Sequence, residues 1–228
     1  HALGDYQLSS SLNIGASLSY LNGRDKLEHR GKLQSDTWQA AVYALLNDGG
    51  PTWLAGDLSV GHSSFDSKRN LLIQANGGPV LLNQQLTGET DALSLGARVL
   101  GGYDFDLGAI KTGPFAGLDY SHSRIDKFHE KQNLRTALEY EEQSFDSLEA
   151  SLGWRVRGAV ALPYGLSLMP YGDIAWVKEL ADGRLDDLDL TARADGQART
   201  ARLGSVDKSF GRAQVGSQLA ITPQLGVY

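Results

Sequence analysis

Residues 148–157 read LEASLGWRVR, and apolar and polar side chains alternate strictly within them. The apolar set is Leu148, Ala150, Leu152, Trp154 and Val156, and the interleaved set is Glu149, Ser151, Gly153, Arg155 and Arg157. Successive side chains of a β-strand point to opposite faces of a sheet, so this pattern predicts a strand with one apolar and one polar face. The same period of two recurs along the chain, for example at 12–20 (LNIGASLSY) and 93–105 (LSLGARVLGGYDF).

This alternation predicts eight strands and the start of a ninth, whereas helical periodicity is hard to find. The strands are expected near residues 11–21, 34–46, 53–65, 91–106, 109–123, 144–161, 166–178 and 208–221, and the ninth begins at Leu225. Several are longer than the roughly 5–6 residues of an ordinary soluble strand. Their length suits tilted strands that cross a bilayer, which need about 9–11 residues.

The connections between these strands alternate in length. The long ones are 22–33, 66–90, 124–143 and 179–207, and the short ones are 47–52, 107–108, 162–165 and 222–224. In an up-and-down antiparallel sheet every second connection emerges on the same side, so all long loops lie at one end. We therefore predict an all-β, antiparallel up-and-down transmembrane β-barrel, a class that has short turns at one end and long loops at the other.

In such a barrel the apolar face meets lipid and the polar face lines the interior. The polar face here consists mainly of Gly, Ser, Asn, Asp and Arg, which suits a closed, curved interior in which charges pair. The predicted lumen-lining residues are Asp57, Arg98, Lys111, Asp119, Glu149, Arg155, Arg157, Asp173 and Arg212. Five cations and four anions are nearly balanced, as a self-satisfying interior network requires.

Aromatic residues lie close to the ends of the predicted strands. Candidates for the two interfacial girdles of the barrel are Tyr20, Trp38, Trp53, Tyr103, Phe105, Tyr120, Tyr164 and Trp176. Amphipathic rings favour the headgroup zone, which supports this interpretation. The alternative is that they are ordinary strand residues, because strands are enriched in aromatics.

Composition narrows the function classes. The chain has 228 residues, a net charge of -6, 27 glycines and no cysteine. The acidic balance argues against nucleic-acid binding, and the absence of cysteine removes disulfides and thiolate chemistry. No apolar run is long enough for a transmembrane helix, and residues 1–11 lack the features of a signal peptide. We expect residues 1–228 to form one barrel domain without an internal boundary, incomplete at both ends.

The sequence shows no catalytic constellation. The five histidines have no compact metal-ligand spacing, no G-x-S-x-G elbow occurs, and residues 96–108 lack a phosphate-binding glycine motif. The carboxylates Glu139, Glu141, Glu142 and Asp146 could bind calcium weakly or form a solvated loop end. We expect no catalytic residue, no metal site and no cofactor.

Several short segments, in their order along the chain, resemble the β-domain of bacterial type V autotransporters. They are 12–20, the strand around Tyr43, 93–105, 114–120 (PFAGLDY), 148–155 and Met169-Pro170-Tyr171. The segment 117–138, with its DYSHSRIDKFHEK run, most resembles the barrels that carry GDSL-type esterase passengers. The resemblance extends over essentially the whole chain.

The resemblance implies a twelve-stranded barrel in the Gram-negative outer membrane, with its long loops extracellular. It implies a translocator and anchor that supports secretion of an N-terminal passenger, with a GDSL-type esterase as the candidate, which this chain does not contain. It further implies as partners the outer-membrane lipid, the passenger's linker helix in the lumen and the barrel assembly machinery, and we expect a monomer. Two alternatives stay open: a passenger-less porin- or adhesin-like barrel, and a soluble β-sandwich or β-clip enzyme.

Overall fold

The computed structural model describes residues 2–27, 31–74, 78–131, 137–163, 166–181, 189–194, 197–202, 208–222 and 225–227. The strands are β1 (Ala2–Gln7), β2 (Leu12–Leu27), β3 (Gly31–Leu46), β4 (Thr52–Gln74), β5 (Val80–Tyr103), β6 (Phe105–Asp106), β7 (Ile110–Ile125), β8 (Phe128–His129), β9 (Glu139–Tyr140), β10 (Gln143–Gly158), β11 (Val160–Ala161), β12 (Ser167–Glu179), β13 (Asp189–Ala194), β14 (Gln197–Arg202), β15 (Ser209–Thr222) and β16 (Leu225–Val227). None of these residues forms a helix that is long and apolar enough to cross a membrane.

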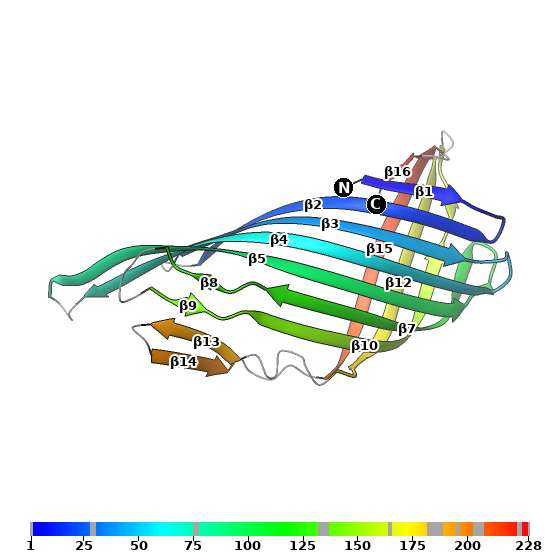
Figure 1. The fold of residues 1–228 in the computed structure, drawn as a ribbon. Coiled ribbons are helices and arrows are strands. Elements are labelled where there is room, and N and C mark those ends of the chain that lie inside the picture. The colour runs from blue at the N-terminus through cyan, green and yellow to red at the C-terminus, as the bar shows by residue number, and fades with distance from the viewer. Residues whose placement is uncertain are drawn as a thin grey trace.

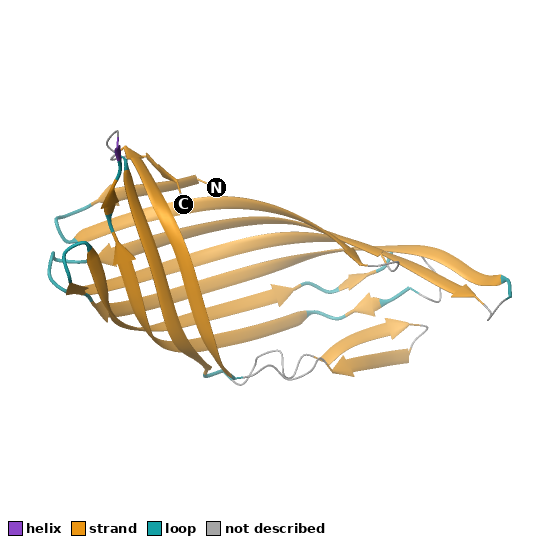
Figure 2. Cartoon of the chain, turned by 180° about the vertical axis from the view of Figure 1, so that it is seen from behind, coloured by secondary structure: helices purple, strands orange, loops and turns teal. Residues whose placement is uncertain are grey.

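One large antiparallel sheet dominates the structure (Figure 1). Its strands follow the chain in the order β1-β2-β3-β4-β5-β7-β10-β12-β15-β16, and β6 and β11 pair beside β7 and β12. The sheet curls so that β12 and β15 cross β2 to β10, behind them in Figure 1 and in front of them in Figure 2, which gives an open half-barrel with a convex and a concave face. The predicted all-β, up-and-down antiparallel architecture is confirmed.

Short connections gather at one end of this sheet, which we call the turn end, and long hairpins at the other, which we call the hairpin end (Figure 1). The turn after β6 shows why a short connection suffices. Gly108 has φ +85°, a conformation that residues other than glycine rarely adopt, and its N–H donates to Asp106 Oδ1 at 2.8 Å. The N–H of Leu107 closes the turn on the carbonyl of Ile110 at 2.9 Å.

Two of the predicted long loops are strand instead. Residues 22–27 and 31–33 continue β2 and β3, and residues 66–74 and 80–90 continue β4 and β5, whose pairing runs from Thr52 with Tyr103 to Gln74 with Val80. In the extensions of β4 and β5 the apolar residues occur in runs, Leu71–Ile73 and Val80–Leu82, so the period of two is lost although the backbone pairing goes on. Residues 2–7 likewise fall outside the predicted strands, yet they form β1 and pair with β2.

The other two predicted loops contribute to a second, four-stranded sheet at the hairpin end, in the order β14-β13-β9-β8. Backbone hydrogen bonds on either side of β8 join this second sheet to the large sheet. The N–H of Asp126 donates to the carbonyl of Asp91 at 2.9 Å, and that of Lys131 donates to Thr87 at 2.8 Å. Residues 126–131 are therefore bound to β5 rather than extended away from it.

Candidate functional site: two faces of a curled sheet

The convex face is apolar and exposed. Leu95, Leu152 and Trp154 have 44%, 66% and 45% of their surface exposed, and Val215 has 89% exposed. Many further large apolar residues on this face, such as Leu18, Leu58, Val99 and Ile174, are exposed as well. Soluble monomers rarely expose contiguous apolar patches above a few hundred Å², so this face is built for an apolar environment.

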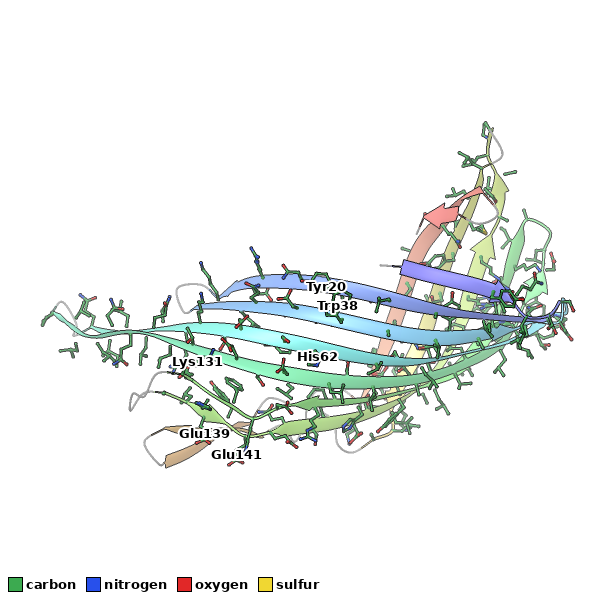
Figure 3. The ribbon with its side chains drawn as sticks, turned by 45° about the horizontal axis from the view of Figure 1, so that its top comes forward. Tyr20, Trp38, His62, Lys131, Glu139 and Glu141 are labelled. Atoms are coloured by element: carbon green, nitrogen blue, oxygen red, sulfur yellow. The ribbon has the colours of Figure 1, made fainter. Side chains whose placement is uncertain are left out.

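Aromatic side chains border the apolar band at both of its edges. Near the hairpin end the Tyr20 and Trp38 rings lie 4.9 Å apart, and the hydroxyl of Tyr20 donates to Asp36. Trp38 stands directly opposite His62, so the three side chains form a row across β2, β3 and β4 (Figure 3). Near the turn end Phe105 stacks on Trp154 with ring centroids 6.2 Å apart.

The distance between these aromatic edges matches a bilayer. Thr112, which pairs with Phe105, and Tyr120 are eight residues apart on β7. Eight residues span about 27 Å along a strand, or roughly 20 Å across a membrane at a tilt of about 40°. This is close to the apolar band of roughly 25 Å that outer-membrane barrels present.

The structure places the eight predicted interfacial aromatics in three different ways. Tyr20, Trp38, Tyr103, Phe105, Tyr120 and Trp176 are exposed on the convex face. Tyr164 lies outside the described residues. Trp53 does not meet the expectation: it is 7% exposed and lies on the concave face, where its ring packs over Gly102 and carries the Arg155 guanidinium 3.4 Å from its centroid. The alternation of the sequence already indicates this position for Trp53, because Trp53 and the predicted lumen residue Asp57 lie on the same face of β4.

The nine predicted lumen residues all lie on the concave face. Strand registers place Asp57 opposite Arg98, Arg98 opposite Asp119, and Asp119 opposite Glu149. Further pairs put Arg155 opposite Asp173, Arg157 opposite Lys111, and Arg212 opposite Ala175. Arg98 Nε lies 2.7 Å from Asp119 and 3.9 Å from Asp57, so one guanidinium serves two carboxylates.

A small apolar cluster also occupies the concave face near the turn end. Trp53, Phe115, Ala175 and Val177 are its buried members, and Leu100 and Phe210 pack against them. The Phe115 ring lies over Gly153, where an added Cβ would come within 2.6 Å of it. Aromatic rings seated on glycines of the neighbouring strand let a strongly curved sheet fill its interior.

Asp104 organises the charges at the turn end. It is 6% exposed and accepts two hydrogen bonds from Arg155, at 3.0 and 2.8 Å, and one from Arg157. Two arginines therefore neutralise one buried carboxylate, and each of the three hydrogen bonds joins two charged groups. The sequence prediction included both arginines but missed Asp104, although the period of two over 93–105 places Asp104 on the same face as Arg98.

A second buried ion pair lies at the hairpin end. Arg69 on β4 donates to Glu130 from Nε and Nη2 at 2.8 and 2.7 Å, and the Leu138 N–H donates to the same carboxylate at 2.8 Å. Hydrogen bonding to Glu130 raises the pKa of Arg69 above its ordinary value, so the arginine stays charged. Phe128 and Tyr140 stack beside the pair with centroids 4.4 Å apart. The pair thus fixes residues 128–130 and 138–140 against the concave side of β4.

Between these ends the concave face contains a hollow of about 210 Å³. Its polar lining residues include Arg98, Asp119, Glu149, Arg155, Asp173 and Arg212. The described residues bring no three metal-ligating side chains together. In the acidic segment 139–146, Glu142 pairs with Arg124 at 2.6 Å and Asp146 lies 2.9 Å from His122. These carboxylates are therefore directed at separate partners.

Comparisons with known proteins agree with this arrangement. The family model "Autotransporter beta-domain" matches residues 2–228. Among solved structures, the translocator domain of the autotransporter NalP from Neisseria meningitidis aligns with a TM-score of 0.64 at 15% identity, covering 96% of this chain and 66% of that one. The β-domain of the Bordetella autotransporter BrkA aligns with a TM-score of 0.51 at 18% identity, covering 95% and 74%. At these identities the structural likeness shows the fold.

Two curated relatives are much longer than the region that they share with this chain. Lipase 1 of Photorhabdus luminescens is 25% identical over 156 residues, which cover 67% of this chain and 23% of the lipase. An uncharacterised protein encoded in the trpE-trpG intergenic region of Pseudomonas putida is 27% identical over 192 residues, covering 80% and 30%. With the family model matched from residue 2 to residue 228, the chain belongs to the autotransporter β-domain family, the outer-membrane translocator and anchor of these proteins.

Proposed function

We propose that this β-domain anchors an N-terminal passenger and holds the passenger's linker on its concave face. The observation that carries the proposal is the inversion of the two faces, since leucines are exposed outside and charged residues line a hollow inside. Outward apolar groups suit lipid, and paired strands leave few backbone groups unsatisfied there. A polar hollow suits a peptide segment better than a lipid chain.

The proposal includes an orientation. The turn end faces the periplasm and the hairpin end, with the Arg69–Glu130 pair, faces outward, as the length difference between turns and hairpins suggests. We further propose that the barrel assembly machinery inserts the domain and that it acts as a monomer.

We place no catalytic step in this chain and assign any hydrolase activity to the passenger. Ser64 donates to Asp91 at 2.7 Å, and His62 lies 3.7 Å from the same carboxylate. The serine therefore has no histidine as its base. The name of the lipase relative favours an ester-hydrolysing passenger.

Surface display in intact cells tests the proposal. The full-length protein is expressed, and passenger exposure is measured by added protease and by hydrolysis of a nitrophenyl ester at the cell surface. We expect protease-accessible passenger, ester hydrolysis by whole cells, and loss of both when residues 1–228 are deleted. An outer-membrane protein without any domain upstream would support the porin- or adhesin-like alternative. Protein that extracts into aqueous buffer without detergent would refute the anchor.

A further inference from the structure

The β4–β5 hairpin ends in an uncharged tip, which comprises residues 70–74 and 80–85. Residues 70–88 contain no charged side chain, and Leu72, Ile73, Val80 and Leu81 have 60%, 46%, 53% and 65% of their surface exposed. We propose that this tip inserts into an anionic lipid surface that approaches the cell from outside. The inference rests on the proposed function only for the outward orientation of the hairpin end.

The tip stands clear of the rest of the structure. Pairing with β3 ends where Gly31 stands opposite Arg69, and the backbone hydrogen bond from Lys131 reaches β5 at Thr87. Beyond these positions, within the described part of the chain, β4 and β5 pair only with each other. They form a two-stranded ribbon that extends past the second sheet (Figure 1).

Both faces of this ribbon are apolar. Successive residues of a strand point to opposite faces, so Leu72 and Leu81 lie on one face, and Ile73 and Leu82 lie on the other. A protein that packs against one face leaves the other exposed, whereas a fluid apolar phase surrounds both. The apolar side chains of the tip cover on the order of 400 Å², about half of what one partner contributes to a stable protein interface. Both points favour lipid over a protein partner.

Two exposed lysines lie just behind the tip. Lys32 stands opposite Lys68 on the convex face, and Lys68 precedes Leu72 by four residues, or about 13 Å. One level closer to the barrel, Asp66 stands opposite Glu89, which is engaged in an ion pair. Positive charge therefore separates the apolar tip from the acidic level. An anionic membrane has its headgroups next to its apolar interior, and lysines at that level strengthen binding.

The tip lies too far from the protein's own membrane to insert there. The aromatic row of Tyr20 and Trp38, with His62 beside them, marks the outer edge of the apolar band (Figure 3). Leu72 lies ten residues beyond His62 on β4, about 33 Å along the strand or about 25 Å along the barrel axis at a tilt of about 40°. Interfacial segments penetrate a lipid surface by only about 5–10 Å. The surface that receives the tip is therefore a second one, outside the cell.

Vesicle sedimentation with the full-length protein in phosphatidylcholine nanodiscs tests the proposal. Sucrose-loaded vesicles of equal parts phosphatidylcholine and phosphatidylglycerol sediment, whereas nanodiscs stay in solution, and we expect the wild-type protein to sediment with the vesicles. The double variant Leu72→Thr, Leu81→Thr keeps strand-forming residues and should bind at least about tenfold more weakly. The matched control is Leu107→Thr, because Leu107 at the turn end is 68% exposed, close to the 65% of Leu81.

Neutralising the lysines gives a second readout. Lys32→Gln and Lys68→Gln should each weaken binding to the anionic vesicles by roughly fivefold and leave binding to pure phosphatidylcholine vesicles unchanged. The matched control is Lys178→Gln, at an exposed position on the convex face away from the tip. All affinities are scaled to the folded fraction, measured as the heat-modifiable band on SDS gels.

Three results would overturn the inference. The first is wild-type protein that stays in solution with the anionic vesicles, and the second is equal binding by the tip variant and the Leu107 control. The third is a tip variant that binds vesicles normally but exposes its passenger to protease, which would show that the passenger covers the tip. In each case a passenger displayed on intact cells leaves the proposed function standing, whereas loss of display in the wild-type protein would refute that function.

Discussion

The substitution Asp104→Asn should destabilise the half-barrel more than any isosteric change at an exposed carboxylate. It keeps the shape of the side chain and removes the charge that Arg155 and Arg157 share. Asp104 has 5% of its side chain exposed and Arg155 has 20%, so this pair is shielded from solvent. Arg157, with 41% exposed, can turn toward water and contributes less.

The magnitude follows from the shielded pair. Breaking a buried ion pair by removing one partner costs about 3–5 kcal/mol, because the remaining charge is left uncompensated. The amide introduced by Asp104→Asn would retain one acceptor oxygen, and Arg155 would keep its contact with the Trp53 ring, so we expect a cost of about 3 kcal/mol, the lower end of that range. For a domain of this size, 1 kcal/mol shifts the unfolding midpoint by about 2–4 °C. The expected shift is therefore roughly 6–12 °C.

Heat modifiability on SDS gels measures this shift as the temperature at which the compact form of the full-length protein disappears. The matched control is Asp106→Asn, two residues along, whose carboxylate lies 3.6 Å from Lys111 with both side chains at least half exposed. Exposed pairs contribute little, so this variant should shift the midpoint by at most about 2 °C. Equal midpoints for the Asp104 and Asp106 variants would refute the role given to the buried network.

Three further changes test other parts of the structure. Leu152→Arg, at an exposed position on the convex face, should cost about 2–4 kcal/mol if it lies near the bilayer midplane, and should reduce the assembled fraction in membranes, whereas Leu152→Val should not. Gly113→Ala should lower the heat-modifiability midpoint, because the added Cβ would lie 1.8 Å from the Tyr103 carbonyl oxygen. The control Gly211→Ala should leave the midpoint unchanged, because no atom lies within 4 Å of the added Cβ. Equal midpoints for the two variants would contradict the close approach at Gly113. Glu130→Gln should speed protease cleavage between residues 126 and 142 without changing the heat-modifiability midpoint, because it weakens only the bonds from Arg69 and Leu138. An unchanged cleavage rate would contradict the role of the Arg69–Glu130 pair in holding this segment.

The sequence predicts strands well where the two faces of the sheet meet different environments. Where one face meets an apolar environment and the other a polar hollow, alternation locates strands such as β10 to within one residue at its start, 144 against 143. Beyond that zone apolar residues occur in runs, such as Leu71–Ile73 and Val80–Leu82, instead of at every second position. The sequence pattern therefore does not indicate strands in the paired extensions of β4 and β5. Glu130 escaped prediction because it lies in a predicted loop, whereas Asp104 lies on the polar face of the predicted strand 91–106 and could have been included. The partners of both carboxylates come from distant strands, which the sequence pattern does not show.

The two faces differ in how specific their chemistry must be. Lipid offers the convex face only an apolar surrounding, so a leucine there can be exchanged for another apolar residue of the strand-forming kind at little cost. The concave face works through individual partners: Arg155 needs Asp104 on one side and the Trp53 ring on the other, and Phe115 needs the space above Gly153. Substitutions that keep the size of the side chain should therefore be tolerated on the convex face and should destabilise the protein on the concave face. A soluble β-sandwich shows the same difference between outside and inside, but its outside is polar and its inside apolar. Tolerance of polar residues at Leu152 together with tolerance of apolar residues at Arg155 would contradict the assignment of both faces.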